Sequence, residues 1–249
     1  MESYQDEVLV LQVNNWQTAD KKVVCYSREH GKIVFMAYGA RYPKSVSGRL
    51  LQPFACLDAE FYPGSRVDKL KSCQLAAPMP QMVLEQMAYG FLMAEITERL
   101  TEQGEASAEI FSLLQNALQL LVKRNPRLAT LAYLIRLLDH CGIGPVYEVC
   151  VNCGRPAEKD GWFSETQGGY ICTECYPAQK KTESLQTFHE GTRRLWQQLR
   201  MLDFSEPGSF SVKGAALMEL EQILHRYLVY QTEQPINSLA FIRQIAGGK

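Results

Sequence analysis

The sequence lacks any long hydrophobic run, and its formal charge is nearly balanced. No apolar stretch of the 249 residues approaches the roughly 20 residues that a membrane-spanning helix needs. The opening residues, MESYQDEVLV, are acidic and polar, unlike a secretory signal. We therefore expect a cytosolic protein that makes no membrane contact. A hydrophobic content of 46% supplies ample material for a globular core.

Motifs that carry catalysis are also missing. The sequence has no glycine-rich phosphate loop followed by Lys and Ser or Thr, which excludes the usual ATPase signature. It has no Ser, His and Asp in the order of a catalytic triad, and no pair of carboxylates at the spacing of a catalytic motif. The four histidines are not spaced as metal ligands: His30, His140, His189 and His225. We therefore expect a binding protein rather than an enzyme.

The cysteines, unlike the histidines, have a spacing that is typical of metal ligands. Four of the eight cysteines form two CxxC pairs separated by 18 residues, namely Cys150, Cys153, Cys172 and Cys175. A disulfide framework is not expected in a reducing compartment, whereas this spacing is typical of a four-thiolate zinc site. Four thiolates close the coordination shell, so the pattern predicts one structural Zn²⁺ ion. Two alternatives stay open, which are unligated cysteines and a thioredoxin-like redox pair.

The first 80 residues carry the pattern of a small β domain. Short β-branched and aromatic segments alternate with polar or glycine-containing breaks, and they lie at 7–13, 22–27, 32–38, about 50–61 and 66–76. We expect turns at Asn14-Asn15 and His30-Gly31, because Asn and Gly tolerate positive φ. Five short strands, with no helical period between the first three, predict a small closed or nearly closed barrel.

From Gln81 the apolar residues recur every three to five positions, which predicts helices. Helices are expected at 81–100, 107–123, 127–141, 182–202 and 213–231, with a short one after Pro235. Between the third and fourth helices lies the cysteine module, in which residues 161–172 predict a β-hairpin. The sequence thus predicts a multi-domain α+β protein. Its parts are a five-stranded barrel at 1–79, a helical domain in two parts at 80–145 and 179–249, and an inserted four-cysteine zinc-finger module at 146–178.

The near-neutral net charge of −1 hides a local bias. Between residues 21 and 49 there is one acid, Glu29, and there are seven bases: Lys21, Lys22, Arg28, Lys32, Arg41, Lys44 and Arg49. A basic stretch on a neutral-to-acidic body is how a site for a polyanion shows in a sequence. The alternative is a solvated surface with unevenly distributed charge.

Strand alternation places basic and aromatic residues together on one face of the second and third strands. Binding of single-stranded DNA needs cations that follow phosphates and flat rings on which bases stack. The loop 39–49 adds further residues of both kinds. The candidate DNA-binding residues are Lys21, Lys22, Arg28, Lys32, Tyr38, Arg41, Tyr42, Lys44 and Arg49. The alternative for the two tyrosines is that they are core residues.

Four sequence runs resemble the RecO family of bacterial recombination mediators. They are REHGKIVFMAYGARYPKSVSGRLLQPF (28–54), LLDHCGIGPVYEVCVNCGRP (137–156), GGYICTEC (168–175) and, more weakly, LHRYLVYQTEQPINSLAFIRQI (224–245). The runs keep the family's order over nearly the whole chain. The resemblance implies an N-terminal oligonucleotide-binding (OB) barrel, a helical domain and a zinc finger set against the helices.

The resemblance also implies a function and partners. The protein is expected to bind single- and double-stranded DNA, to anneal complementary strands and to help load RecA onto DNA coated by single-strand-binding protein, near the nucleoid. RecR and the acidic tail of the single-strand-binding protein are the expected partners, and a monomer is the default. That tail is expected to bind the helical body, where exposed-face candidates are Lys123, Arg124, Arg127, Arg193 and Arg194.

Three rival functions remain open at the level of sequence. The first is another nucleic-acid-binding protein, associated with RNA or transcription, that combines a barrel with a zinc ribbon. The second is an enzyme in which the zinc module is only a scaffold. The third is a scaffold that binds proteins alone. A preference for structured RNA would favour the first, a cleft with convergent titratable groups the second, and a lack of nucleic-acid binding the third.

Overall fold

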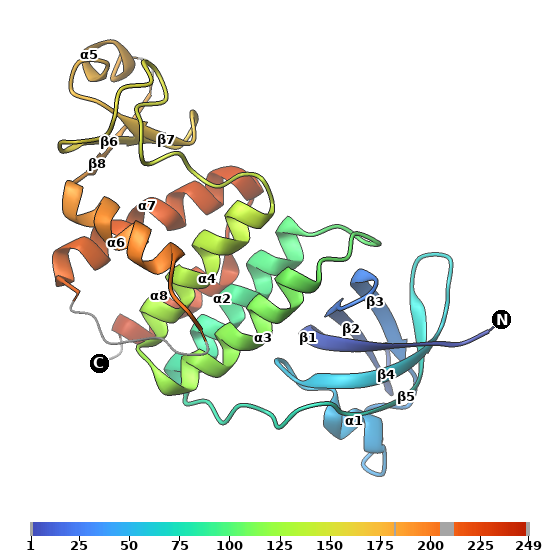
Figure 1. Ribbon diagram of the computed structural model, residues 1–249. Coiled ribbons are helices and arrows are strands. Elements are labelled where there is room, and N and C mark those ends of the chain that lie inside the picture. The colour runs from blue at the N-terminus through green and yellow to red at the C-terminus, as the bar shows by residue number, and fades with distance from the viewer. Residues whose placement is uncertain (1, 182, 205–211, 248–249) are drawn as a thin grey trace. The chain divides into compact units, whose positions relative to one another are not determined.

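The computed structural model describes residues 2–181, 183–204 and 212–247 (Figure 1). The chain divides into two compact units, Met1–Pro126 with Phe241–Lys249, and Arg127–Ala240. The domain limits expected at residues 79, 145 and 178 stay a prediction. Among the described residues, no helix combines the length and hydropathy that crossing a membrane demands.

The first unit begins with a closed five-stranded barrel, as the sequence predicts. Its strands are β1 (Tyr4–Trp16), β2 (Asp20–Ser27), β3 (Gly31–Ala37), β4 (Cys56–Tyr62) and β5 (Asp68–Leu75). Their order around the barrel is β1-β2-β3-β5-β4. All neighbours are antiparallel except β3 and β5, which pair in parallel over two residues only. The barrel is OB-like, and Figure 1 shows it in blue and cyan.

Two details of the barrel differ from expectation. The strand β1 continues through Asn14-Asn15, which pair with β2, and the chain turns at Gln17, whose φ is +47°. The fourth strand starts only at Cys56, because a short helix precedes it, α1 (Val46–Leu50). The hydroxyl of Ser45 accepts a hydrogen bond from the backbone N–H of Gly48, which caps this helix at its start.

Side chains alternate across the barrel wall as predicted. Val23 and Cys25 of β2 and Ile33 and Phe35 of β3 are buried in the barrel core. The outer face is divided into two parts. Near α2 (Leu84–Leu100) and α3 (Ala108–Lys123) the outward residues are buried, and these are Leu9, Leu11, Val24 and Tyr26. The rest of that face lies open.

The two helices are joined to the outer face by polar contacts as well as by apolar packing. The backbone N–H of Ser107, which caps the start of α3, donates to the hydroxyl of Tyr26, 3.2 Å away. Phe54 packs on α2, where its ring lies 5.0 Å from that of Phe91 and leaves no room for a side chain at Gly90. The helices α2 and α3 therefore cover part of the outer surface of the barrel.

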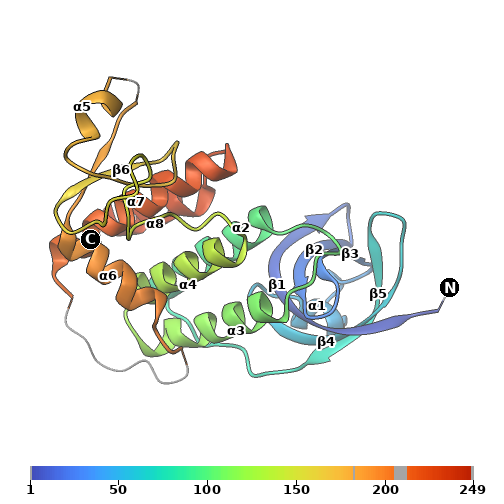
Figure 2. The same cartoon turned by 45° about the horizontal axis from the view of Figure 1, so that its top comes forward.

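The second unit contains helices and a small sheet (Figure 2). Its helices are α4 (Pro126–His140), α5 (Tyr176–Gln179), α6 (Glu190–Arg200) and α7 (Gly214–Thr232), and α8 (Asn237–Gly247) follows across the boundary between the units. An ion pair between Arg127 and Glu221 joins α4 to α7, and one of 2.7 Å between Arg200 and Asp139 joins α6 to α4. The helix expected at 182–202 starts later, at Glu190, because residues 186–188 form a strand.

Candidate metal centre and nucleic-acid interface

The cysteine module is a three-stranded sheet that carries two tight turns. The strands are β6 (Gly161–Ser164), β7 (Gly169–Ile171) and β8 (Gln186–Phe188), in the order β7-β6-β8. The hairpin predicted between the two cysteine pairs is therefore present. In the first turn, the backbone N–H of Gly154 donates to the carbonyl of Cys150 at 2.8 Å, and Gly154 has a φ of +72° that suits glycine. The second turn leads from Cys172 into α5.

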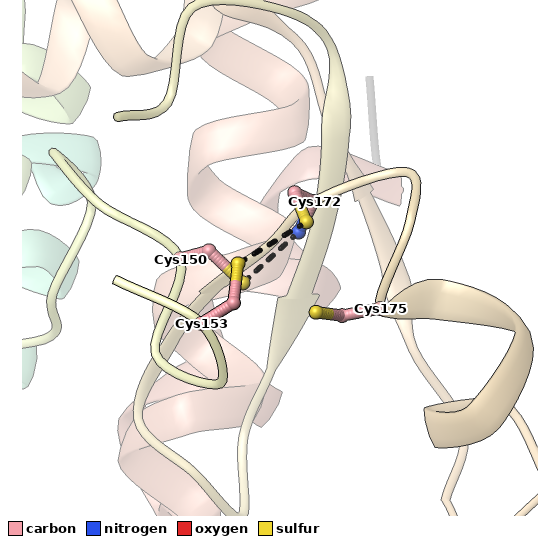
Figure 3. A group of neighbouring side chains, drawn as sticks. All are labelled: Cys150, Cys153, Cys172 and Cys175. Atoms are coloured by element: carbon pink, nitrogen blue, oxygen red, sulfur yellow. Dashed lines mark hydrogen bonds between the residues drawn. The ribbon is translucent and has the colours of Figure 1, made fainter. Parts of the chain in front are cut away.

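These turns bring the four predicted ligands together. The sulfurs of Cys150, Cys153, Cys172 and Cys175 all lie within 4.8 Å of one another. The sulfurs of Cys153 and Cys172 are 3.7 Å apart, close to the roughly 3.8 Å expected between sulfurs of a tetrahedral zinc site with bonds of about 2.3 Å. Figure 3 shows the side chains of both pairs pointing toward one point between the turns.

Electrostatics of the cluster also suit a cation. Burial by itself raises the pKa of Cys150, but backbone N–H groups of Cys172, Cys153 and Asn152 that bond its sulfur lower the pKa to about 7. Burial and hydrogen bonds with the neighbouring thiols raise the pKa of Cys175 to about 12. The cluster thus favours ionisation of one thiol, Cys150, but opposes ionisation of a further one, Cys175. Four thiolates fit this cluster when a metal cation neutralises their charge.

Arg193 of α6 holds the cysteine module from one side. Its guanidinium donates to the backbone carbonyls of Ala157 at 2.7 Å and Phe188 at 3.1 Å, and it lies 4.7 Å from the centre of the Tyr170 ring. The residue is only 5% exposed. The expectation that Arg193 lies on an exposed helix face is therefore wrong, because the carbonyls and the ring of the module enclose its charge. Its neighbour Arg194 is exposed as expected.

Three partly buried bases of the predicted DNA-binding set have partners inside the first unit, and the exposed Arg41 has one as well, because its guanidinium donates to the carbonyl of Gln17 at 3.0 Å. The ammonium of Lys32 donates to the carbonyl of Glu98 in α2, 2.7 Å away. Arg28 forms a 2.8 Å ion pair with Glu7, and its guanidinium lies 4.4 Å from the centre of the Phe111 ring of α3.

Lys21 is the third of these bases. Its ammonium donates to the carbonyls of Gly48 and Leu51 at 2.7 and 3.1 Å, at the end of α1, and burial lowers its pKa. These contacts give Lys21, Arg28 and Lys32 structural roles in the barrel, whatever they contribute to binding.

Five other predicted residues are exposed on the segment that follows β3, and Arg41 among them contacts the turn between β1 and β2. We call this group the rim: Tyr38, Arg41, Tyr42, Lys44 and Arg49. Tyr38 and Tyr42 are 62% and 64% exposed, so neither belongs to the core. The backbone N–H of Arg41 donates to the carbonyl of Ala19 at 2.8 Å, which attaches the rim loop to the β1–β2 turn.

Trp16 is an exposed aromatic residue that the sequence reasoning missed. It ends β1, is 46% exposed, and has the ammonium of Lys22 5.9 Å from its ring centre. The missed signal was the strand alternation itself, which continues outward through Asn14 to Trp16 once Asn14-Asn15 is not taken as a turn. Lys22, the remaining predicted base, thus stands beside a ring on the open part of the barrel.

The combination of an OB-like barrel, exposed aromatic and basic residues and a four-cysteine cluster that fits a metal ion is typical of nucleic-acid-binding proteins as a class. Comparison with known families agrees. The family description "Recombination protein O N terminal" matches residues 1–79, and "Recombination protein O C terminal" matches residues 82–240. The chain belongs to the RecO family of DNA repair and recombination proteins.

Two of the relatives compared match over nearly the full length of the chain, and a third matches over about 70% of it. The chain is 28% identical over 244 residues to the DNA repair protein RecO of Pelotomaculum thermopropionicum, covering 97% of this chain and 94% of the relative. It is 27% identical over 249 residues to that of Moorella thermoacetica, covering 98% and 92%. It is 30% identical over 188 residues to that of Cutibacterium acnes, covering 71% and 76%. The family resemblance expected from the four sequence runs is thus confirmed.

Proposed function

We propose that this protein is a non-catalytic recombination mediator. In this role it binds single- and double-stranded DNA, anneals complementary strands and helps load RecA onto DNA coated by single-strand-binding protein. The observation that carries the proposal is the rim, which offers two exposed tyrosines beside exposed bases on the barrel of a RecO-family chain. Cations follow phosphates and rings stack on bases, which is the chemistry that binding of single-stranded DNA requires.

Two bases of the rim are suited to bind phosphates. Lys44 and Arg49 are exposed, and neither has an ion pair with another residue that the structure describes. A cation without a protein partner can replace a counterion on DNA, whereas a paired one must first give up its partner. We therefore assign phosphate binding chiefly to Lys44 and Arg49, with Lys22 and Arg41 beside them.

The metal in this proposal is one structural Zn²⁺ ion. Cys150, Cys153, Cys172 and Cys175 would hold it, and four thiolates leave no open position for a substrate or a reactive water. The ion would stabilise the turns of the cysteine module, whose sheet is also held by Arg193. Its contribution is to folding and not to a reaction.

Partner proteins are assigned to the helices. An acidic tail that ends in hydrophobic residues needs apolar surface next to cations, and exposed Val122 at the end of α3 is followed by exposed Lys123 and Arg124. We propose that this helix end takes part in binding the tail of the single-strand-binding protein. RecR is the other proposed partner, the chain acts as a monomer, and its place in the cell is the bacterial nucleoid.

The test is strand annealing on complementary DNA strands coated with single-strand-binding protein, without nucleotide. The wild-type chain should accelerate annealing, and the double variant Lys44→Ala/Arg49→Ala should lose most of this activity. Lys159→Ala/Lys181→Ala removes two exposed bases from the cysteine module and serves as the charge-matched control. A wild-type chain that leaves annealing at the spontaneous rate, or binds structured RNA in preference to single-stranded DNA, would overturn the proposal.

A further inference from the structure

The four cysteines of the module differ in their access to solvent. Cys153 is exposed, whereas Cys150 and Cys172 are 1% and 8% exposed. The sulfur of Cys150 accepts a hydrogen bond from the backbone N–H of Cys172 at 3.4 Å, which holds that sulfur in the interior of the module. Cys153 is therefore the ligand that is most open to a small reagent in the solvent.

A reaction partner for Cys153 lies in the other turn. The sulfurs of Cys153 and Cys172 are 3.7 Å apart, and Figure 3 shows them facing each other. An ion pair between Arg155 and Glu174 joins the same two turns. A small movement would bring the two sulfurs from this separation to the roughly 2.05 Å of a disulfide bond.

Ionisation and exposure together decide which cysteines react with a peroxide. The thiolate is the reactive form, and cysteines that bind a metal ion do so as thiolates. The four cysteines outside the module are different, because burial raises the pKa of each of their thiols: Cys25, Cys56, Cys73 and Cys141. A peroxide should therefore oxidise the module and spare the rest of the chain.

We propose that the cysteine module is a reversible peroxide-sensitive switch, in which a disulfide between Cys153 and Cys172 replaces the metal ion. Cys153 is the residue attacked first, and Cys172 is the residue that closes the disulfide. The inference rests on the proposed zinc site and does not depend on where DNA binds. It differs from a thioredoxin-like pair, because the disulfide joins one CxxC pair to the other.

The reaction with hydrogen peroxide takes place in two steps. The thiolate of Cys153 attacks one peroxide oxygen, so that an S–O bond forms, the O–O bond breaks and hydroxide leaves. The thiolate of Cys172 then attacks the sulfur of Cys153, an S–S bond forms, the S–O bond breaks and a second hydroxide leaves. The two sulfurs together lose two electrons, and the peroxide is reduced to two water molecules once both hydroxides take protons from the solvent. Cys150 and Cys175 alone cannot fill a four-ligand shell, so the ion is released.

The switch should change α5 more than the sheet of the module. Pairing among β6, β7 and β8 and the contacts of Arg193 do not involve the four sulfurs. Cys175, in contrast, directly precedes α5, and Tyr176 stacks on Trp162 with ring centres 3.7 Å apart and planes 11° apart. Without a metal bond to Cys175 this stack should open, and the fluorescence of Trp162 should change.

The first experiment follows the metal and the disulfide together. Hydrogen peroxide should release about one zinc ion per chain to a metallochromic dye, and a thiol reductant with added zinc should reverse the release. Digestion with trypsin and a glutamate-specific protease separates Cys172 from Cys175, because Glu174 lies between them. Fragmentation of the linked peptides in a mass spectrometer then distinguishes Cys153 from Cys150. A disulfide within one CxxC pair, or between Cys150 and Cys175, would refute the assignment.

The second experiment compares two variants that keep a complete ligand set, because three cysteines and one histidine also form a zinc site. Cys153→His lacks the thiolate that is attacked first and should release zinc roughly tenfold more slowly than the wild type. Cys175→His keeps both reacting sulfurs and should release zinc at close to the wild-type rate. Equal rates of release from the two variants would overturn the proposal. If either variant does not bind zinc, the disulfide found in the wild type decides.

Trp162→Phe provides a separate check on α5. It should release zinc as the wild type does but lose the change in tryptophan fluorescence, and a change of wild-type size would place the movement elsewhere.

Failure of the switch and failure of the proposed zinc site are distinguishable. A chain purified under reducing conditions that contains no zinc and binds none refutes the site. A chain that binds zinc and keeps it in peroxide refutes only the switch, and annealing by Lys44→Ala/Arg49→Ala tests the DNA-binding proposal independently of both.

Discussion

The ammonium of Lys32 on β3 donates a hydrogen bond of 2.7 Å to the backbone carbonyl of Glu98 in α2. This contact joins the barrel to its neighbouring helix across 66 positions of sequence. A lysine within a basic stretch that looks available to DNA is thus engaged within the protein. Internal contacts of this kind distinguish Lys21, Arg28 and Lys32, which have structural roles in the barrel, from the exposed bases of the rim.

Replacing Lys32 should therefore affect stability more than DNA binding. Lys32→Ala removes a charge-assisted hydrogen bond and should lower the free energy of unfolding by about 1–2 kcal/mol. The salt dependence of single-strand binding should stay that of the wild type. Lys44→Ala should do the reverse, with unchanged stability and a slope reduced by about 0.7. Denaturant melts and salt titrations of both variants test this, and a Lys32→Ala chain of full stability but reduced slope contradicts it.

Glu98 gives a prediction for pH. Burial is the main cause that raises the pKa of this carboxyl, although Lys32 opposes the rise. The folded protein thus holds the proton of Glu98 more tightly than the unfolded chain does. The protonated carboxyl therefore contributes stability at low pH, and this contribution is lost as pH rises through the raised pKa. Glu98→Gln should melt at a higher temperature than the wild type at neutral pH. The difference should shrink as pH falls toward 4.5, and a difference that does not depend on pH would contradict the assignment.

The cysteine cluster predicts the result of metal analysis. The purified chain should contain about one zinc ion, and Cys153→Ser should lower both the metal content and the melting temperature, because metal binding and folding are coupled. Cys73→Ser, at a half-buried cysteine of the barrel, is the matched control and should keep the zinc. Complete zinc removal without any change in melting would argue against a structural metal.

Arg193 should be important for stability although it is an arginine on a helix. Arg193→Ala leaves the carbonyls of Ala157 and Phe188 without their donor and removes the cation from the Tyr170 ring. We expect a loss of roughly 2–4 kcal/mol in the free energy of unfolding. Arg194→Ala, one position further on the exposed face, should change stability by no more than about 0.5 kcal/mol. Similar melting curves for the two variants would refute the buried role.

Local patterns were sufficient to predict the barrel and the four-cysteine cluster. Alternation places Val23 and Phe35 inside because the strand period is two whatever the rest of the chain does. The spacing of Cys150 and Cys153 implies a tight turn for a similar reason, since two intervening residues hold both sulfurs close together. The second pair, Cys172 and Cys175, could be assigned to the same site only because it repeats the CxxC spacing of the first pair.

Tertiary structure decided which charges and rings remain available. Lys32 is bound to Glu98, and Arg28 contacts Glu7 and Phe111. Arg193 is bound to the cysteine module. All these partners lie at sequence separations that no local pattern specifies. The alignment of residues 22, 36, 69 and 62 across four neighbouring strands likewise follows only from strand register. A side chain's period follows from its own strand, but its partners depend on how distant segments pack, and the partners determine whether a cation is free to bind DNA.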